Sequence, residues 1–129
     1  MFREKAPLGA TSTIVAKAGK PVVVVGTPGG RRIINTVLQV ILNIVDHGMN
    51  VGQAVEAGRM HHQWLPDVAT FEPWALSPDT RKVYEAMGHT LRVRDHTWGS
   101  VMAIAVNYET GLLAGAADSR APDAGAEGH

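Results

Sequence analysis

Two adjacent glycines, Gly29 and Gly30, separate four valines from a long apolar segment in the stretch VVVVGTPGGRRIINTVLQVILNIVDHG, residues 22–48. Backbone N–H groups at the start of a helix lack partners and attract negative charge. The pair could therefore hold a phosphate, or stabilise the oxyanion that forms during acyl transfer. The structural alternative is a tight strand-to-helix turn, in which Pro28 sets φ and the glycines allow a sharp bend.

Other chemistry-bearing patterns are weak. GTPGGR is neither GxGxxG nor GxxxxGK[ST], which argues against nucleotide binding. His61 and His62 are adjacent, so their imidazoles diverge and cannot supply two ligands to one ion. None of the four serines lies in a GxSxG motif, and there is no cysteine. We therefore expect no metal and no cofactor, and an oxyanion site without an evident nucleophile.

The bulk composition bounds the class of protein. The 129 residues suit one domain, and 12 basic and 12 acidic side chains cancel, which argues against nucleic-acid and membrane-surface binding. No apolar export segment follows the start MFREKAPLGATS, and no run is long enough to span a membrane. The absence of cysteine fits the cytoplasm and the periplasm equally well, so the compartment stays open.

The elements that must position the glycine pair are clear in the first half. Residues 12–17 and 21–26 predict a hairpin of two strands, the second apolar on both faces. A helix is expected over 31–47, with Gly48 ending it. Its polar residues recur every three or four positions and are expected to form one narrow wet stripe: Thr36, Gln39, Asn43 and Asp46.

The second half alternates short helices and strands. A capping box formed by Asn50 and Gln53 starts a short helix, and Ser77 and Pro78 start another that ends at Gly88. Strands are expected around 68–72 and in HTLRVRD, followed by a hairpin that turns at 109–111. Such hairpin-connected strands indicate an α+β domain with a mostly antiparallel sheet. We place this domain at 1–117 and a mobile tail at 118–129.

The segment HHQWLP, residues 61–66, is expected to be packed rather than metal-binding. In this interpretation Trp64 and Leu65 are buried beside the main helix, while His61 and His62 point in different directions. The imidazoles then form local hydrogen bonds.

Several motifs occur in one order along nearly the whole chain: GTPGGRRIINTVLQVILNIVDHGMNVGQAV, HHQWLPD, SPDTRKVYEAMGH, GSVMAIAV and GAADSRAPD. This order resembles the C-terminal part of the small subunit of γ-glutamyltranspeptidase. The resemblance implies part of the αββα sandwich of the N-terminal-nucleophile hydrolases, with helices on one face of the sheet. It implies a transferase and hydrolase of glutathione metabolism, an acyltransferase in which an N-terminal threonine attacks the γ-glutamyl bond.

Carried onto this sequence, the paired glycines of the family's oxyanion hole are Gly29 and Gly30. The family has PLSSM, whose two serines hold the substrate's α-carboxylate, where this chain has PLGATS. Gly9 and Ala10 align with those serines and bring no hydroxyl. Thr11 or Ser12 would substitute only if the loop shifts its register.

The family's nucleophilic threonine lies upstream of the segment that matches PLGATS, so this sequence is expected to lack the attacking group. The implied partners are a γ-glutamyl compound such as glutathione and an upstream large-subunit or nucleophile-bearing chain. Without that chain, one face of the 22–25 strand is expected to stay exposed and to cause self-association. Three hypotheses remain: part of a γ-glutamyltransferase that is inactive alone, a non-catalytic remnant, and a stand-alone anion- or peptide-binding module.

Overall fold

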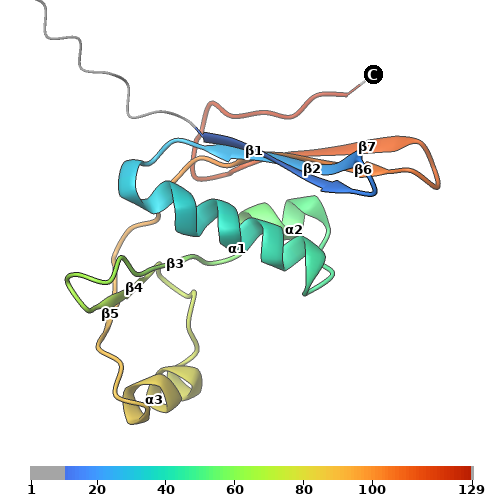
Figure 1. Ribbon diagram of the computed structural model, residues 1–129. Coiled ribbons are helices and arrows are strands. Elements are labelled where there is room, and N and C mark those ends of the chain that lie inside the picture. Colours follow the sequence, from blue (N-terminus) through green and yellow to red (C-terminus); the bar gives the residue numbers. More distant parts are fainter. Residues whose placement is uncertain (1–10, 129) are drawn as a thin grey trace, which may run out of the picture.

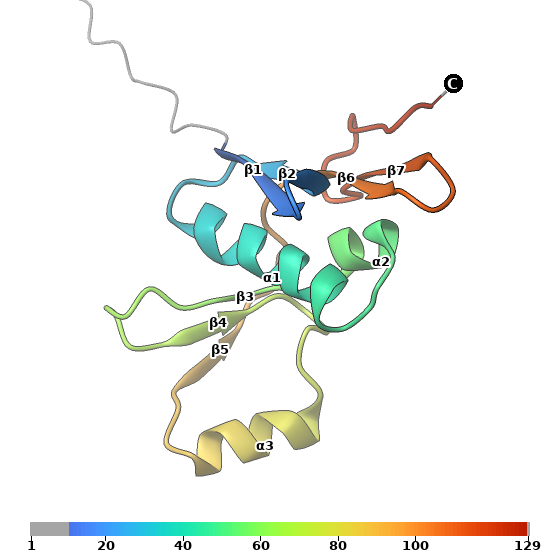
Figure 2. The same ribbon diagram turned by 45° about the vertical axis from the view of Figure 1, so that its right-hand side comes forward.

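The computed structural model describes residues 11–128, which form an α+β arrangement (Figures 1 and 2). The larger sheet has the strand order β1-β2-β6-β7 and is antiparallel throughout. Its strands are β1 (Thr11–Lys17), β2 (Lys20–Thr27), β6 (Met102–Asn107) and β7 (Leu112–Ala117). Both predicted hairpins are confirmed, and the α+β class with them.

Helices cover one face of this sheet, as the sequence predicts (Figure 2). A short 3-10 turn, η1 (Gly30–Arg32), leads into α1 (Ile33–Val45), and α2 (Val51–Glu56) follows. The Asn50–Gln53 capping box at α2 is confirmed. Apolar residues from the sheet and the two helices form the core between the layers: Val23, Val25, Ile33, Val37, Val40, Val51, Ala54, Val55, Val101 and Ala103.

The expected solvent-exposed polar stripe of α1 is exposed only at Asp46, which corrects the expectation for its other three residues. Thr36 is buried, and Gln39 and Asn43 hydrogen-bond to protein. The solvent-facing side of α1 is instead apolar, with Ile34 exposed to 77% and Leu38 to 50%. The reason is that the chain after α2 packs along the polar side, where its backbone groups need hydrogen-bond partners.

A second, smaller sheet lies beneath α1, away from the four-stranded sheet (Figure 1). It comprises β3 (Met60–His61), β4 (Ala69–Phe71) and β5 (Leu91–Val93), and β4 pairs with β5 in parallel. The crossover between β4 and β5 contains α3 (Pro78–Ala86). The expected start of this helix is confirmed, because Ser77 caps it and Pro78 occupies its first turn.

The other face of the large sheet carries no helix. Ile14, Val24, Ile104 and Gly115 lie in register across its four strands. The segment after β7 runs over this face (Figure 1), where a Cβ added at Gly115 would lie 3.5 Å from the Ala126 Cβ. Ile14 nevertheless remains 66% exposed and Ile104 45% exposed. The predicted apolar outer face is therefore present in the described part of the chain.

Two further expectations can be compared with the structure. The Asp118 side chain is buried and ion-paired, so packing continues past residue 117; the domain and tail boundaries stay a prediction. Within residues 11–128, no helix combines the length and apolar character needed to cross a bilayer.

Candidate functional site

The paired glycines lie where β2 passes into η1. Gly29 has φ 142° and ψ 14°, and Gly30 has φ 59°. Residues other than glycine rarely adopt these backbone conformations. Space is not the constraint, since a Cβ at Gly30 would meet nothing within 4 Å and one at Gly29 would only touch Ile33 at 3.9 Å. Glycine is therefore required here by the backbone.

In this glycine loop (residues 28–30), the Gly29 and Gly30 amides have no acceptor within the described residues. The Gly29 carbonyl accepts a hydrogen bond from the Arg32 N–H at 3.3 Å, but across residues 11–128 neither the Gly29 nor the Gly30 N–H donates one. Unpaired N–H groups are expected at a helix start, and consecutive ones suit an anion or a developing oxyanion. Whether these amides act on a substrate stays a prediction.

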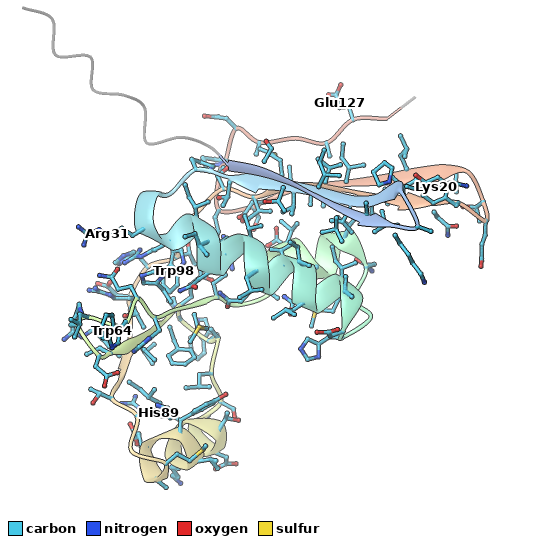
Figure 3. All side chains as sticks on the ribbon, viewed as in Figure 1. Lys20, Arg31, Trp64, His89, Trp98 and Glu127 are labelled. Carbon is cyan, nitrogen blue, oxygen red and sulfur yellow. The ribbon has the colours of Figure 1, made fainter. Side chains whose placement is uncertain are left out.

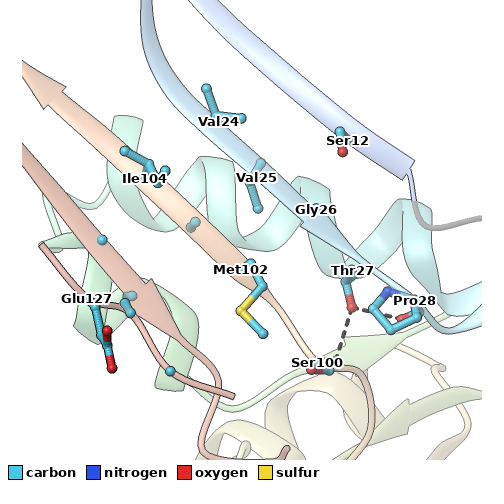
Figure 4. A pocket seen from close by; sticks show the side chains of 15 residues that line it. Ser12, Val24, Val25, Gly26, Thr27, Pro28, Ser100, Met102, Ile104 and Glu127 are labelled. Carbon is cyan, nitrogen blue, oxygen red and sulfur yellow. Dashed lines mark hydrogen bonds between the residues drawn. The ribbon is translucent and has the colours of Figure 1, made fainter. Parts of the chain in front are cut away.

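The loop is held from behind by the segment before β6. The Thr27 hydroxyl donates to the Pro28 carbonyl at 2.8 Å and accepts from the Ser100 N–H at 3.1 Å (Figure 4). Gly99 permits this approach because a Cβ there would lie 3.0 Å from the Arg59 guanidinium. Thr27 is itself buried, so these contacts fix the end of β2 and the start of the loop.

Behind this support lies a buried ion-pair network that sequence reasoning missed. Arg120 donates two hydrogen bonds to the Glu72 carboxylate, from Nε at 2.9 Å and from Nη2 at 2.6 Å. It also forms an ion pair with Asp118 at 3.1 Å. Arg59 pairs with Asp118 as well. Glu72 further accepts the Trp98 N–H at 2.9 Å, which anchors the segment that supports the glycine loop.

Burial and pairing compete in this network. Burial raises the pKa of Asp118, but N–H donation from Val101 and Arg120 and the Arg59 side chain outweigh it, so the pKa lies below its ordinary value. Burial lowers the pKa of Arg59, and the Asp118 hydrogen bond opposes that effect. One feature of the sequence could have predicted this network, namely charged residues directly after apolar elements. Arg59 follows α2, and Asp118 and Arg120 follow β7.

The His61–Pro66 segment is only partly as expected. Asn35 donates to His61 Nδ1, which leaves the Nε2–H of His61 for Gln63, while His62 Nε2 faces Asp67. The two rings therefore do point in different directions. The burial predicted for Trp64 and Leu65 is wrong, since these residues are 78% and 65% exposed.

Their exposure follows from topology. Trp64 lies in the loop between β3 and β4 and points outward (Figure 3), beyond the residues that Asn35 of α1 contacts. In residues 11–128, no group of three His, Asp or Glu side chains is placed to hold a metal ion.

Of the four residues considered for recognition of the substrate's α-carboxylate, only Thr11 and Ser12 belong to the described part of the chain. Gly9 and Ala10 lie outside the described residues, and Thr11 begins β1. Ser12 pairs with Gly26 and lines a cavity of about 710 Å³ with Thr27, Pro28 and Ser100 (Figure 4). Gly29 lines a different cavity, so the structure does not bring Ser12 and the glycine pair together in one cavity.

The amino-acid sequence matches a known protein family and its curated members. The gamma-glutamyltranspeptidase family model matches residues 4–128. The chain is 48% identical over 120 residues to the glutathione hydrolase proenzyme of Escherichia coli K12, a match that covers 92% of this chain and 20% of that protein. It therefore spans about a fifth of the length of such curated relatives.

Two solved structures carry the same arrangement. A mutant γ-glutamyltranspeptidase of Helicobacter pylori is 40% identical with a TM-score of 0.82, and the match covers 94% of this chain and 66% of that chain. The Pseudomonas nitroreducens γ-glutamyltranspeptidase complexed with L-DON is 33% identical with a TM-score of 0.81, over 100% of this chain and 67% of that chain.

Proposed function

Because the chain belongs to the γ-glutamyltranspeptidase family, we propose that its glycine loop supplies the oxyanion hole for hydrolysis or transfer of γ-glutamyl amides such as glutathione. The observation that carries the proposal is that the adjacent Gly29 and Gly30 amides at the strand-to-helix junction have no acceptor in the described part of the chain. The chain shares part of the N-terminal-nucleophile hydrolase fold, as one sheet with helices on one face.

In this proposal the loop acts on a carbonyl that another residue attacks. The negative charge that develops on the carbonyl oxygen is met by two N–H donors, and the start of α1 adds its positive end. The support from Thr27 and Ser100 holds the donors before the substrate arrives, which is what makes such stabilisation effective. The attacking threonine and a large-subunit partner belong to the family pattern upstream of PLGATS.

A chimera tests this function. The corresponding fifth of the Escherichia coli relative is replaced by this chain, and hydrolysis of γ-glutamyl-p-nitroanilide is measured. We expect the chimera to mature and turn over. Gly30→Ala keeps the N–H but disfavours φ 59°, so it should move this donor out of line and lower kcat, by up to the factor of about 10²–10³ that a lost oxyanion donor costs. Gly111→Ala is the matched control, since Gly111 also has a positive φ and open space but lies in the β6–β7 turn.

The alternative is a non-catalytic remnant or a binding module with the family scaffold. It is favoured by the departure at Gly9 and Ala10, and by the separation of Ser12 from the glycine cavity. A chimera that folds and matures but releases no p-nitroaniline would support this alternative. Equal losses in Gly30→Ala and Gly111→Ala would likewise contradict the oxyanion role.

A further inference from the structure

A second feature adjoins the glycine loop. A cavity of about 380 Å³ lies between the start of α1 and the smaller sheet, and Gly29 is one of its walls. Four arginines from two distant segments line it: Arg31 and Arg32 in η1, and Arg92 and Arg94 in and after β5. Figure 3 shows Arg31 at the start of α1, on the side of the loop that carries Trp64. We name this cavity the arginine pocket.

Arg94 attracts the neighbouring exposed carboxylate of Asp95, but no ion pair within the described residues neutralises the arginine pocket. Its lining contains no carboxylate. None of the ion pairs or side-chain hydrogen bonds found within residues 11–128 involves the four guanidinium groups. The Nε of Arg94 is even buried without an acceptor. Arg32 stacks over the Trp98 ring at 4.6 Å, which holds it in place without neutralising its charge.

These arginines, of which Arg31 and Arg92 are exposed, contrast with the two arginines of the buried ion-pair network. Arg59 and Arg120 are each matched by buried carboxylates. Four like charges around one cavity repel one another and raise the local concentration of anions. Planar guanidinium groups fit a carboxylate with two parallel bonds, so a ligand carboxylate suits this cavity.

We propose that the arginine pocket binds the terminal carboxylate of the peptide leaving group of a γ-glutamyl substrate. The inference rests on the proposed function, because Gly29 belongs both to the glycine loop and to the pocket wall. In this proposal the scissile carbonyl lies at the glycine amides and the leaving group extends along this wall. In a dipeptide leaving group the terminal carboxylate lies at most about 7 Å further on, at 3.3–3.6 Å for each extended residue.

The pocket is therefore a specificity device for the leaving group, separate from the recognition of the glutamyl α-carboxylate. A cavity of this volume lies within the range typical of small-ligand sites, which is about 300–1,000 Å³. Substrates without a carboxylate on the leaving group gain nothing from it.

Binding to the full chain tests the proposal directly. Isothermal titration at fixed ionic strength compares glutathione with glutathione whose glycine carboxylate is converted to the amide. We expect the amide to bind about tenfold more weakly. Arg31→Gln and Arg92→Gln should each weaken glutathione about fivefold to tenfold, yet leave binding of the amide unchanged. Arg81→Gln is the control, because it removes the same charge from the exposed face of α3.

Three results would overturn the proposal. The first is equal binding of glutathione and its amide. The second is an equal loss in Arg81→Gln, which would show a general charge effect. The third is inorganic phosphate binding at Arg31 and Arg92 as tightly as glutathione, which would show an unspecific anion site.

The chimera separates this inference from the proposed function. Arg92→Gln should raise the KM for glutathione about fivefold to tenfold and leave the KM for γ-glutamyl-p-nitroanilide unchanged, because that leaving group has no carboxylate. Turnover of both substrates with no such difference would refute the arginine pocket alone. A chimera inactive on both substrates, with carboxylate-dependent binding intact in the chain, would refute the proposed catalytic function alone.

Discussion

At the scale of single residues, some positions near the glycine loop are determined by backbone conformation and others by side-chain chemistry. Gly29 and Gly30 are set by φ and not by crowding, whereas the arginines nearby are set by charge. A residue in a sparsely populated backbone conformation persists only when its surroundings enforce it. Here Thr27 and Ser100 provide that enforcement at the end of β2.

The strain at the loop predicts a measurable asymmetry between glycines. Gly29→Ala should lower the free energy of unfolding by about 1–3 kcal/mol, since alanine does not tolerate φ 142°. Gly52→Ala, inside α2, should instead raise it by about 0.5–1 kcal/mol, because glycine is unfavourable in a helix. Urea titration measures the free energy of unfolding of both variants. An unchanged midpoint for Gly29→Ala would contradict the expected backbone strain.

The glycine pair could be predicted from the sequence, but the arginine pocket could not. PGG is contiguous, and its place between strand and helix is visible in the sequence. Arg31 and Arg92 are sixty-one positions apart, and only the β4–α3–β5 crossover brings them to one cavity. No local pattern carries that information.

At the scale of elements, α1 is the organising helix, and its two sides have exchanged their expected roles. The side chain of Gln39 pairs with Met60 as a strand would, accepting the Met60 N–H at 2.8 Å and donating to its carbonyl at 2.7 Å. Asn35 donates to the His62 carbonyl at 2.8 Å. The smaller sheet is thus attached to α1 by side-chain amides.

Removing this attachment should be costly. Gln39→Ala leaves the Met60 N–H and carbonyl without their partner, and we expect a loss of about 1–3 kcal/mol in unfolding free energy. Leu38→Gln, on the exposed side of α1, should stay within about 0.5 kcal/mol of the parent chain. Thermal or urea unfolding distinguishes them. If Leu38→Gln proves the more destabilising variant, the assignment of the two sides of α1 is wrong.

Hairpins, caps and helix starts could be predicted because they depend on local residues such as Asn50, Ser77 and Gly111. The polar side of α1 could not, because its partners come from a segment about twenty residues later. Periodicity shows that two sides of a helix differ, but it does not show which side meets protein. The exposure of Trp64 was missed for the related reason that an aromatic side chain can sit at a loop tip.

At the scale of the whole molecule, the four-stranded sheet has one helical layer and one open apolar face. The outward row includes Ile14, Val24 and Ile104, and the edge strand β1 has no neighbour on its outer side within the described residues. Large exposed apolar patches and unpaired edges both favour association with another chain.

We therefore expect the chain alone to self-associate. Size-exclusion chromatography with light scattering should show dimers or larger species at micromolar concentration. Joint Ile14→Lys and Ile104→Lys substitution should restore a monomer, whereas Val83→Lys on α3, also an exposed apolar position, should not. A monomeric parent chain would contradict this expectation.

The buried ion pairs predict a loss of stability in acid. Because the folded-state pKa of Asp118 lies below the ordinary value of about 3.9, its contribution is full above that pH and is lost as the pH falls through the folded pKa. Asp118→Asn should cost about 3–5 kcal/mol at pH 7, since it leaves Arg59 buried without its counter-ion.

The same substitution should flatten the dependence of unfolding free energy on pH below about 5. Asp67→Asn, which breaks an exposed pair with His62, should change stability by no more than about 1 kcal/mol. Urea midpoints measured from pH 3 to 7 make the comparison. An unaltered slope in Asp118→Asn would show that the acid sensitivity arises elsewhere.

The pairing of Arg59 with Asp118 also orders events during synthesis. The ribosome delivers the guanidinium 59 residues before the carboxylate that neutralises it. In a nascent chain that has not yet reached Asp118, burying Arg59 would leave its charge uncompensated, so the junction between α2 and β3 stays hydrated. The hairpin of β1 and β2 has no such dependence and is free to form early. Translation thus delays the burial of Arg59 until Asp118 has been synthesised.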